Sequence, residues 1–212
     1  MKVIILMLTL LFVQMPALAI DKTTYDDMIS VFLKAVEGDS SAQKKSYRML
    51  SQLNQQYPED ALVKVYLGSI LAIKGRDAWM PWNKLNYTEK GMDLMDDALN
   101  MLDEEDTVYV DHLSRSVAEE VKTTAAATFT QVPKMFGRFE QGLEILTDMS
   151  EQPEYTHLKD LQRGVFEYYL ADALQLDGQK EAAEKWFSLA LKSGLDKTKT
   201  QHANEFLAGI KH

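Results

Sequence analysis

Residues 167–195 carry the sequence pattern that most restricts the fold of this chain. Small and large apolar residues recur there at helical spacing on both sides of a glycine. The pattern consists of Leu170, Ala171, Leu174, Gly178, Ala183, Phe187 and Ala190. A small residue facing a large one lets two antiparallel helices approach closely, and Gly178 suits the turn between them. Because one such helix–turn–helix unit cannot bury its apolar face alone, the pattern predicts neighbouring units of the same kind.

Residues 1–19 have the composition of an export signal. A positive charge comes first, residues 3–13 are almost continuously apolar, and a proline ends the run. Ala17 and Ala19 occupy the −3 and −1 positions of a signal-peptidase site, which predicts cleavage between Ala19 and Ile20. The apolar run is shorter than the about 20 residues of a transmembrane helix, and a retained membrane anchor is the alternative. We therefore expect a periplasmic or secreted chain with no stable membrane insertion after cleavage.

Residues 20–212 would then form one domain of ordinary size. The formal net charge of the full sequence is −9, and a surface this acidic repels nucleic acid and anionic lipid. We therefore expect no nucleic-acid partner. The chain has no cysteine, so no disulfide stabilises it and lipid attachment to a cysteine is excluded. Its stability must come from the helical core.

Apolar residues at helical spacing fall into four pairs of segments, followed by a single segment. The pairs cover about residues 24–57, 60–103, 108–149 and 158–195, and the last segment covers about residues 198–210. In the third pair, the spacing predicts one long helix over residues 108–130 that ends before Pro133. No stretch alternates with a period of two, so we expect no β-strands. These patterns predict an all-α fold.

Two of the pairs resemble the tetratricopeptide-repeat (TPR) superfamily. The resemblance is specific over residues 167–195. In the second pair, the matching positions of the first helix are Leu67, Gly68, Leu71 and Gly75. The resemblance implies a TPR-like right-handed α-α superhelix of about four degenerate antiparallel helix pairs plus a C-terminal helix. The chain departs from the family at Glu167, where the first helix usually carries tryptophan.

An insertion interrupts the second pair, because its second-helix spacing resumes only at Gly91. The inserted residues include Trp79, Trp82 and Lys84. Two tryptophans three positions apart could form a stacking surface for a peptide, a sugar or a glycan strand, with the lysine as a polar contact. Alternatively, the tryptophans fill the gap that the insertion opens between helices. Both interpretations remain open from the sequence.

A small group of basic residues is the second candidate site. It consists of Arg115, Lys122, Lys134 and Arg138. Arg115 and Lys122 lie seven positions apart and so on one helix face, while Lys134 and Arg138 flank a predicted bend. In an acidic protein, such a surface could bind a carboxylate such as a peptide C-terminus. Alternatively, these residues pair with neighbouring glutamates on a solvated face.

No other pattern favours a metal site or catalysis. The acidic residues within 93–106 lack the glycine and glutamate spacing of a calcium loop. Met92 and Met95 could bind copper, but Met95 falls at a core position. None of the four histidines has another at the i+3 or i+4 spacing of a helix-borne zinc site. With no phosphate loop, serine elbow or cysteine nucleophile in the sequence, we expect no catalytic residue, metal or cofactor.

These patterns favour an exported, non-catalytic interaction or scaffold protein of the bacterial cell envelope that docks a polypeptide segment on its concave face. The residues expected to line that face are Trp79, Trp82, Lys84, Arg115 and Arg138. The alternative is a periplasmic small-ligand or peptide-binding protein with an aromatic pocket near Trp79 and Trp82. A closed cavity beside Trp82 would favour the ligand, and an open groove would favour the polypeptide. An enzyme acting on cell-wall material would need two carboxylates about 5 to 9.5 Å apart near the tryptophans.

Overall fold

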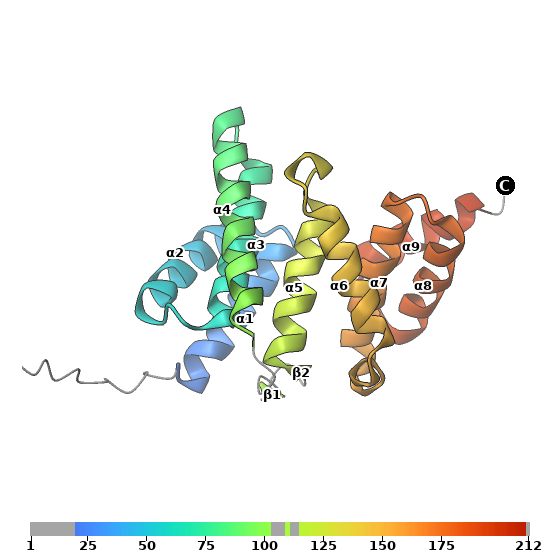
Figure 1. Ribbon diagram of the computed structural model, residues 1–212, viewed down its shortest axis with the longest axis horizontal. Helices are drawn as coiled ribbons and strands as arrows, with labels where there is room; N and C mark the ends of the chain where they lie inside the picture. The colour runs from blue at the N-terminus through green and yellow to red at the C-terminus, as the bar shows by residue number, and fades with distance from the viewer. Residues whose placement is uncertain (1–19, 103–108, 111–114, 211–212) are drawn as a thin grey trace, which may run out of the picture.

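The computed structural model describes residues 20–102, 109–110 and 115–210 (Figure 1). In these residues, nine α-helices make up nearly all of the regular structure. They are α1 (Lys22–Val36), α2 (Ser40–Gln56), α3 (Ala61–Asp77), α4 (Pro81–Asn100), α5 (Val117–Gln131), α6 (Phe139–Glu151), α7 (Asp160–Leu176), α8 (Lys180–Ser193) and α9 (Lys197–Ile210). Two short 3-10 helices, η1 (Lys134–Phe136) and η2 (Pro153–His157), join some of them. The all-α prediction is confirmed, and none of the described helices is long and apolar enough to cross a membrane.

The helices pack in consecutive pairs. Helix α1 packs on α2, α3 on α4, α5 on α6 and α7 on α8, while α9 packs on α8. The first helices of successive pairs also contact one another, so that α1, α3, α5 and α7 form a continuous row. In Figure 1 the array runs from α2 at the left to α8 and α9 at the right.

Buried apolar side chains form two clusters that meet at α5. The first cluster joins α1 to α5 around Tyr66 and Phe129. The second joins α5 to α9 around Phe166 and Phe187. Helix α5 supplies Ala125 to the first cluster and Ala126 to the second, so this helix joins the two halves of the array.

Glycines with positive φ form three of the four turns within pairs. Gly38, Gly137 and Gly178 have φ values of 102°, 68° and 83°, a region that side chains with a Cβ rarely adopt. The turn between α3 and α4 contains no such glycine. Instead α3 continues through Gly75 to Asp77, and α4 begins at Pro81, a favoured first position of a helix. The insertion therefore lengthens the hairpin of α3 and α4, which projects beyond its neighbours at the top of Figure 1.

Helices α3 and α4 touch backbone to backbone. A Cβ on Gly68 would lie 2.5 Å from the carbonyl oxygen of Gly91, and a Cβ on Gly91 would lie 2.5 Å from that of Gly68. Near the hairpin end, a Cβ on Gly75 would lie 2.3 Å from Oγ1 of Thr88. Glycine at these positions lets α4 follow α3 closely along its length.

Two expectations about the third pair are wrong. Strands β1 (Tyr109–Val110) and β2 (Arg115–Ser116) form a short antiparallel ladder where no strand was expected. The long helix expected over residues 108–130 begins only at Val117. The cause is a capping box, in which Ser116 accepts a hydrogen bond from the Glu119 backbone and the Glu119 carboxylate accepts one from the Ser116 backbone. This reciprocal cap fixes the N-terminus of α5 directly after Ser116.

Some expectations fall outside the described residues. They concern the signal segment 1–19, the acidic residues 103–106 and His112.

Candidate functional site

A groove runs along the row of first helices. Side chains from α1, α3, α5 and α7 line it, with further residues from α4, α9 and the segment after α5, and they enclose about 610 Å³. Phe32, Leu33 and Val36 form its apolar end on α1. We call this surface the first-helix groove.

The floor of the first-helix groove is rich in hydroxyl groups. Thr123, Thr124 and Thr128 of α5 line it together with Ser69 of α3, and the hydroxyl oxygens of Thr128 and Ser69 lie 3.2 Å apart. The hydroxyl of Thr124 donates to the carboxylate of Glu120 at 3.1 Å, and that of Thr128 lies 2.8 Å from the carbonyl of Thr124. Because each of these two protons has an acceptor within the protein, the hydroxyl oxygens can themselves accept hydrogen bonds from a ligand.

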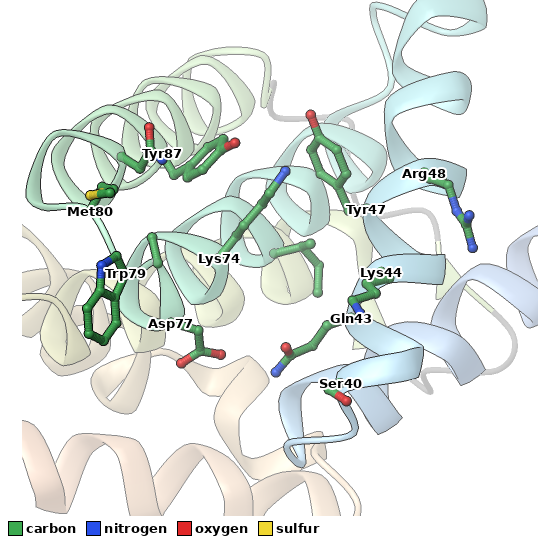
Figure 2. Close-up of a pocket in the computed structure, with 13 residues that line it drawn as sticks. Ser40, Gln43, Lys44, Tyr47, Arg48, Lys74, Asp77, Trp79, Met80 and Tyr87 are labelled. Atoms are coloured by element: carbon green, nitrogen blue, oxygen red, sulfur yellow. The ribbon is translucent and has the colours of Figure 1, made fainter.

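A second cavity, of about 560 Å³, lies between α2 and the hairpin of α3 and α4. We call it the hairpin cavity. Its wall is mainly apolar and includes Ile70, Trp79 and Met80. The side chain of Lys74 extends from α3 between two tyrosines on different helices (Figure 2). Its Nζ lies 3.7 Å from the ring centre of Tyr47 and 4.4 Å from that of Tyr87.

Both tryptophans of the insertion are exposed. Trp79 retains 89% and Trp82 64% of its accessible surface, so the interpretation that they fill a gap between helices is wrong. Trp79 lines the hairpin cavity, whereas Trp82 lines neither of the two cavities. Lys84 lines the first-helix groove, where its Nζ donates a 2.7 Å hydrogen bond to the carbonyl of Arg76. These three residues therefore do not line one cavity.

Arg138 links two second helices. Its guanidinium lies 2.5 Å from the carboxylate of Asp96 on α4, which also accepts a hydrogen bond from Gln141 at 3.2 Å. This position is not on the first-helix groove, contrary to the expectation. Arg115 lies in β2, paired with Val110, and its side chain is outside the described part of the structure.

The other two residues of the basic group, Lys134 and Lys122, also lie outside the first-helix groove. Nζ of Lys134 lies 3.9 Å from the ring centre of Phe139 and 4.0 Å from the carboxylate of Asp177. Lys122 is exposed on α5. The basic residues that the structure describes therefore do not converge on one carboxylate site.

We expect the link between Arg138 and Asp96 to stabilise the fold. Because both side chains are about a quarter to a third exposed, a double-mutant cycle with Asp96→Ala and Arg138→Ala should give a coupling energy of about 1 kcal/mol in urea unfolding. The matched control is Lys64 with Asp97, which are 3.8 Å apart with Asp97 60% exposed, and its coupling should be near zero. Equal coupling energies in the two cycles would contradict this role for Arg138.

Four tyrosines are held in their protonated form. Burial, the largest cause, raises the pKa of the phenols of Tyr25, Tyr155, Tyr168 and Tyr169 above the ordinary value. Tyr25 also donates a hydrogen bond to Asp60, which further stabilises the protonated phenol. Tyr155 does the same toward Glu167, a residue that is itself buried. Tyr168 and Tyr169 line the first-helix groove.

Metal ligands and paired carboxylates were the two arrangements that the sequence left to be looked for. No three His, Cys, Asp or Glu side chains come together there as a metal site. Among the described residues that line the hairpin cavity, Asp77 is the single carboxylate. The hydrogen bond from Arg76 lowers the pKa of Asp77, so this group is ionised. The described lining of this cavity therefore contains one carboxylate and not the pair that a glycosidase uses.

Comparison of the chain with protein-family models, with curated proteins and with solved structures gave no match. The assignment of a function therefore depends on the geometry of the two cavities.

Sequence reasoning singled out one lining residue of each cavity, Trp79 and Lys84, and missed the others that the argument depends on. Tyr47, Lys74 and Tyr87 come from three different helices, so no sequence spacing relates them. The threonine hydroxyls of the first-helix groove, which we call the hydroxyl row, could have been recognised from the sequence. Thr124 and Thr128 are one helical turn apart on α5, and threonine is uncommon inside helices unless its hydroxyl bonds the preceding turn.

Proposed function

We propose that this protein is an exported, non-catalytic interaction protein of the bacterial cell envelope, with a TPR-like right-handed superhelix that docks an extended polypeptide segment. The observation that carries the proposal is that α1, α3, α5 and α7 all contribute side chains to one groove. In helical-repeat proteins, stacked repeats create an extended concave surface of this kind, which binds the partner. The apolar leader with small residues before Ile20 supports export.

The hydroxyl row suits the backbone of an extended peptide. Thr124 and Thr128 are separated by four positions on α5, which is about 6 Å along the helix axis. Backbone N–H groups on the same side of an extended chain repeat at about 6.8 Å. A segment lying along α5 can therefore donate successive N–H groups to these two hydroxyl oxygens.

The α1 end of the groove supplies apolar contacts. Leu33 and Val36 line it and retain 53% and 37% of their surface. Apolar side chains of a partner would cover them, because burial of exposed apolar surface favours association. We therefore expect a segment with apolar side chains at one end and an extended backbone over α5.

A groove-blocking variant tests this function. Thr128→Arg places a long charged side chain in the first-helix groove, so chemical crosslinking in cells followed by co-purification and mass spectrometry should recover much less of the partner polypeptide. The matched control is Thr147→Arg on α6, because Thr147 is exposed outside the groove and its hydroxyl also bonds the carbonyl one turn back at 2.8 Å.

The two variants should recover different amounts of the partner polypeptide but have the same fold. Circular dichroism should show the same helical content for Thr128→Arg, Thr147→Arg and the unchanged protein. If Thr128→Arg recovers the same polypeptides in the same amounts as Thr147→Arg, the first-helix groove is not the docking surface.

A further inference from the structure

We propose that the hairpin cavity binds a small organic carboxylate with an apolar or aromatic body, and that Lys74 binds its negative charge. This site is separate from the first-helix groove, because Tyr47 and Lys74 line the hairpin cavity alone. It gives the small-ligand alternative a specific place and a specific chemistry.

Lys74 has a charge that the surrounding protein does not neutralise. Its Nζ contacts the rings of Tyr47 and Tyr87, and within the described chain no carboxylate forms an ion pair with it. The two rings attract the ammonium group through their π-electrons and hold it in place. A cation fixed between apolar rings, with part of its hydration shell removed, is favourably placed to bind an anion.

The charges around the hairpin cavity also favour an anion. Lys44 and Arg48 of α2 line it in addition to Lys74, and Asp77 is the one acidic lining residue described. Asp77 is already paired with Arg76, with Nε 2.7 Å from its carboxylate. The cavity therefore has an excess of positive charge in a chain whose net charge is −9, and this excess favours the binding of an anion there.

The size and the walls of the cavity determine the rest of the ligand. A volume of about 560 Å³ falls within the range of sites for small molecules. Trp79, Met80 and Ile70 provide apolar contacts, and the indole of Trp79 gains most because it is 89% exposed without a ligand. A body as large as an aromatic ring or a medium acyl chain would cover it.

Dansyl-phenylalanine and its amide are a matched pair of fluorescent probes for this site. The two differ only in that the amide has no carboxylate. Dansyl-phenylalanine should bind at least about tenfold more tightly than the amide, because a charge-assisted contact with Lys74 is absent for the amide. Trp79 should transfer excitation energy to the bound dansyl group, and Trp79→Phe should reduce this transfer.

Three variants assign the preference to Lys74. Lys74→Met should weaken binding of dansyl-phenylalanine about tenfold and leave that of the amide unchanged, whereas Lys74→Arg should retain the preference. Lys84→Met is the matched control, because Lys84 lines the first-helix groove and not the hairpin cavity. It should bind both probes as the unchanged protein does, and circular dichroism should show the same helical content for all three.

Competition then distinguishes two sources of the same chemistry. Displacement of the probe by decanoate indicates an acyl-chain ligand, and displacement by N-acetyl-phenylalanine indicates the C-terminus of a peptide. Equal affinity for the acid and the amide, equal affinity of Lys74→Met and the unchanged protein, or displacement by neither carboxylate would overturn the proposal. These results do not depend on whether the first-helix groove binds a polypeptide. A failure of one proposal can therefore be distinguished from a failure of the other.

Discussion

Gly91→Ala should lower the free energy of unfolding by about 2 to 3 kcal/mol. The added Cβ would lie 2.5 Å from the carbonyl oxygen of Gly68, 3.0 Å from the backbone nitrogen of Ala72 and 3.2 Å from Cβ of Leu71. All three atoms belong to the rigid part of α3 and cannot move aside as the end of a flexible side chain does. The helices must therefore separate, which loses packing along the whole of the longest hairpin. Urea unfolding followed by circular dichroism measures the change.

Gly209→Ala is the matched control for Gly91→Ala. Gly209 lies in α9, and a Cβ there would meet nothing within 4 Å. Alanine is the better helix former, so this variant should be as stable as the unchanged protein or more stable by up to about 1 kcal/mol. If Gly91→Ala were also stabilising, the close backbone contact of α3 and α4 would be wrong.

The protein should lose stability steeply above pH 10. Burial raises the pKa of Tyr25, Tyr155, Tyr168 and Tyr169 above the ordinary value of 10.0. Below pH 10 these phenols are protonated in both the folded and the unfolded chain, so they have no effect on stability. Above pH 10 the unfolded chain releases protons that the folded chain retains, and the free energy of unfolding therefore falls as the pH rises.

The size of this fall follows from the number of phenols. Each phenol that stays protonated in the folded state alone contributes about 1.4 kcal/mol per pH unit. Because all four rings are only partly buried, solvent reduces the sum, and we expect about 2 to 3 kcal/mol per pH unit in total.

Tyrosinate absorbance and circular dichroism measured on the same samples test this prediction. Part of the tyrosinate signal should appear only when the helices are lost. Tyr155→Phe removes one of the four phenols, so stability should fall less steeply with pH in this variant. Complete ionisation of the tyrosines near pH 10 in a chain that is still fully helical would show that the phenols are not protected.

Sequence patterns predicted the helices where local contacts determine them. Apolar residues that recur at i, i+3 and i+4 predicted the positions of most helices. Gly38 and Gly178 predicted two of the turns within pairs. The start of α5 was missed although the capping box of Ser116 and Glu119 is a local signal. Apolar residues continue at helical spacing before Ser116, so periodicity alone places the start of the helix too early.

The candidate sites were predicted less well because burial depends on neighbouring helices. From the sequence, the two tryptophans of the insertion could either fill a gap between helices or be exposed to solvent. They are exposed because α3 and α4 both extend beyond the neighbouring helices. Arg138 was expected on a binding surface, yet Asp96, distant in sequence, lies within 2.5 Å of it. No pattern along one helix reveals such a partner.

The sequence by itself determined that this chain forms paired α-helices with close contacts at small residues. Helical periodicity and turn glycines act over a few positions, so they can be read along the chain. The tertiary structure alone decided that Trp79 is exposed, that Thr124 and Thr128 lie in a groove, and that Lys74 lies between Tyr47 and Tyr87. The physical reason is that a cavity forms where helices from different pairs meet, and the distance and angle between them depend on the packing of the entire core.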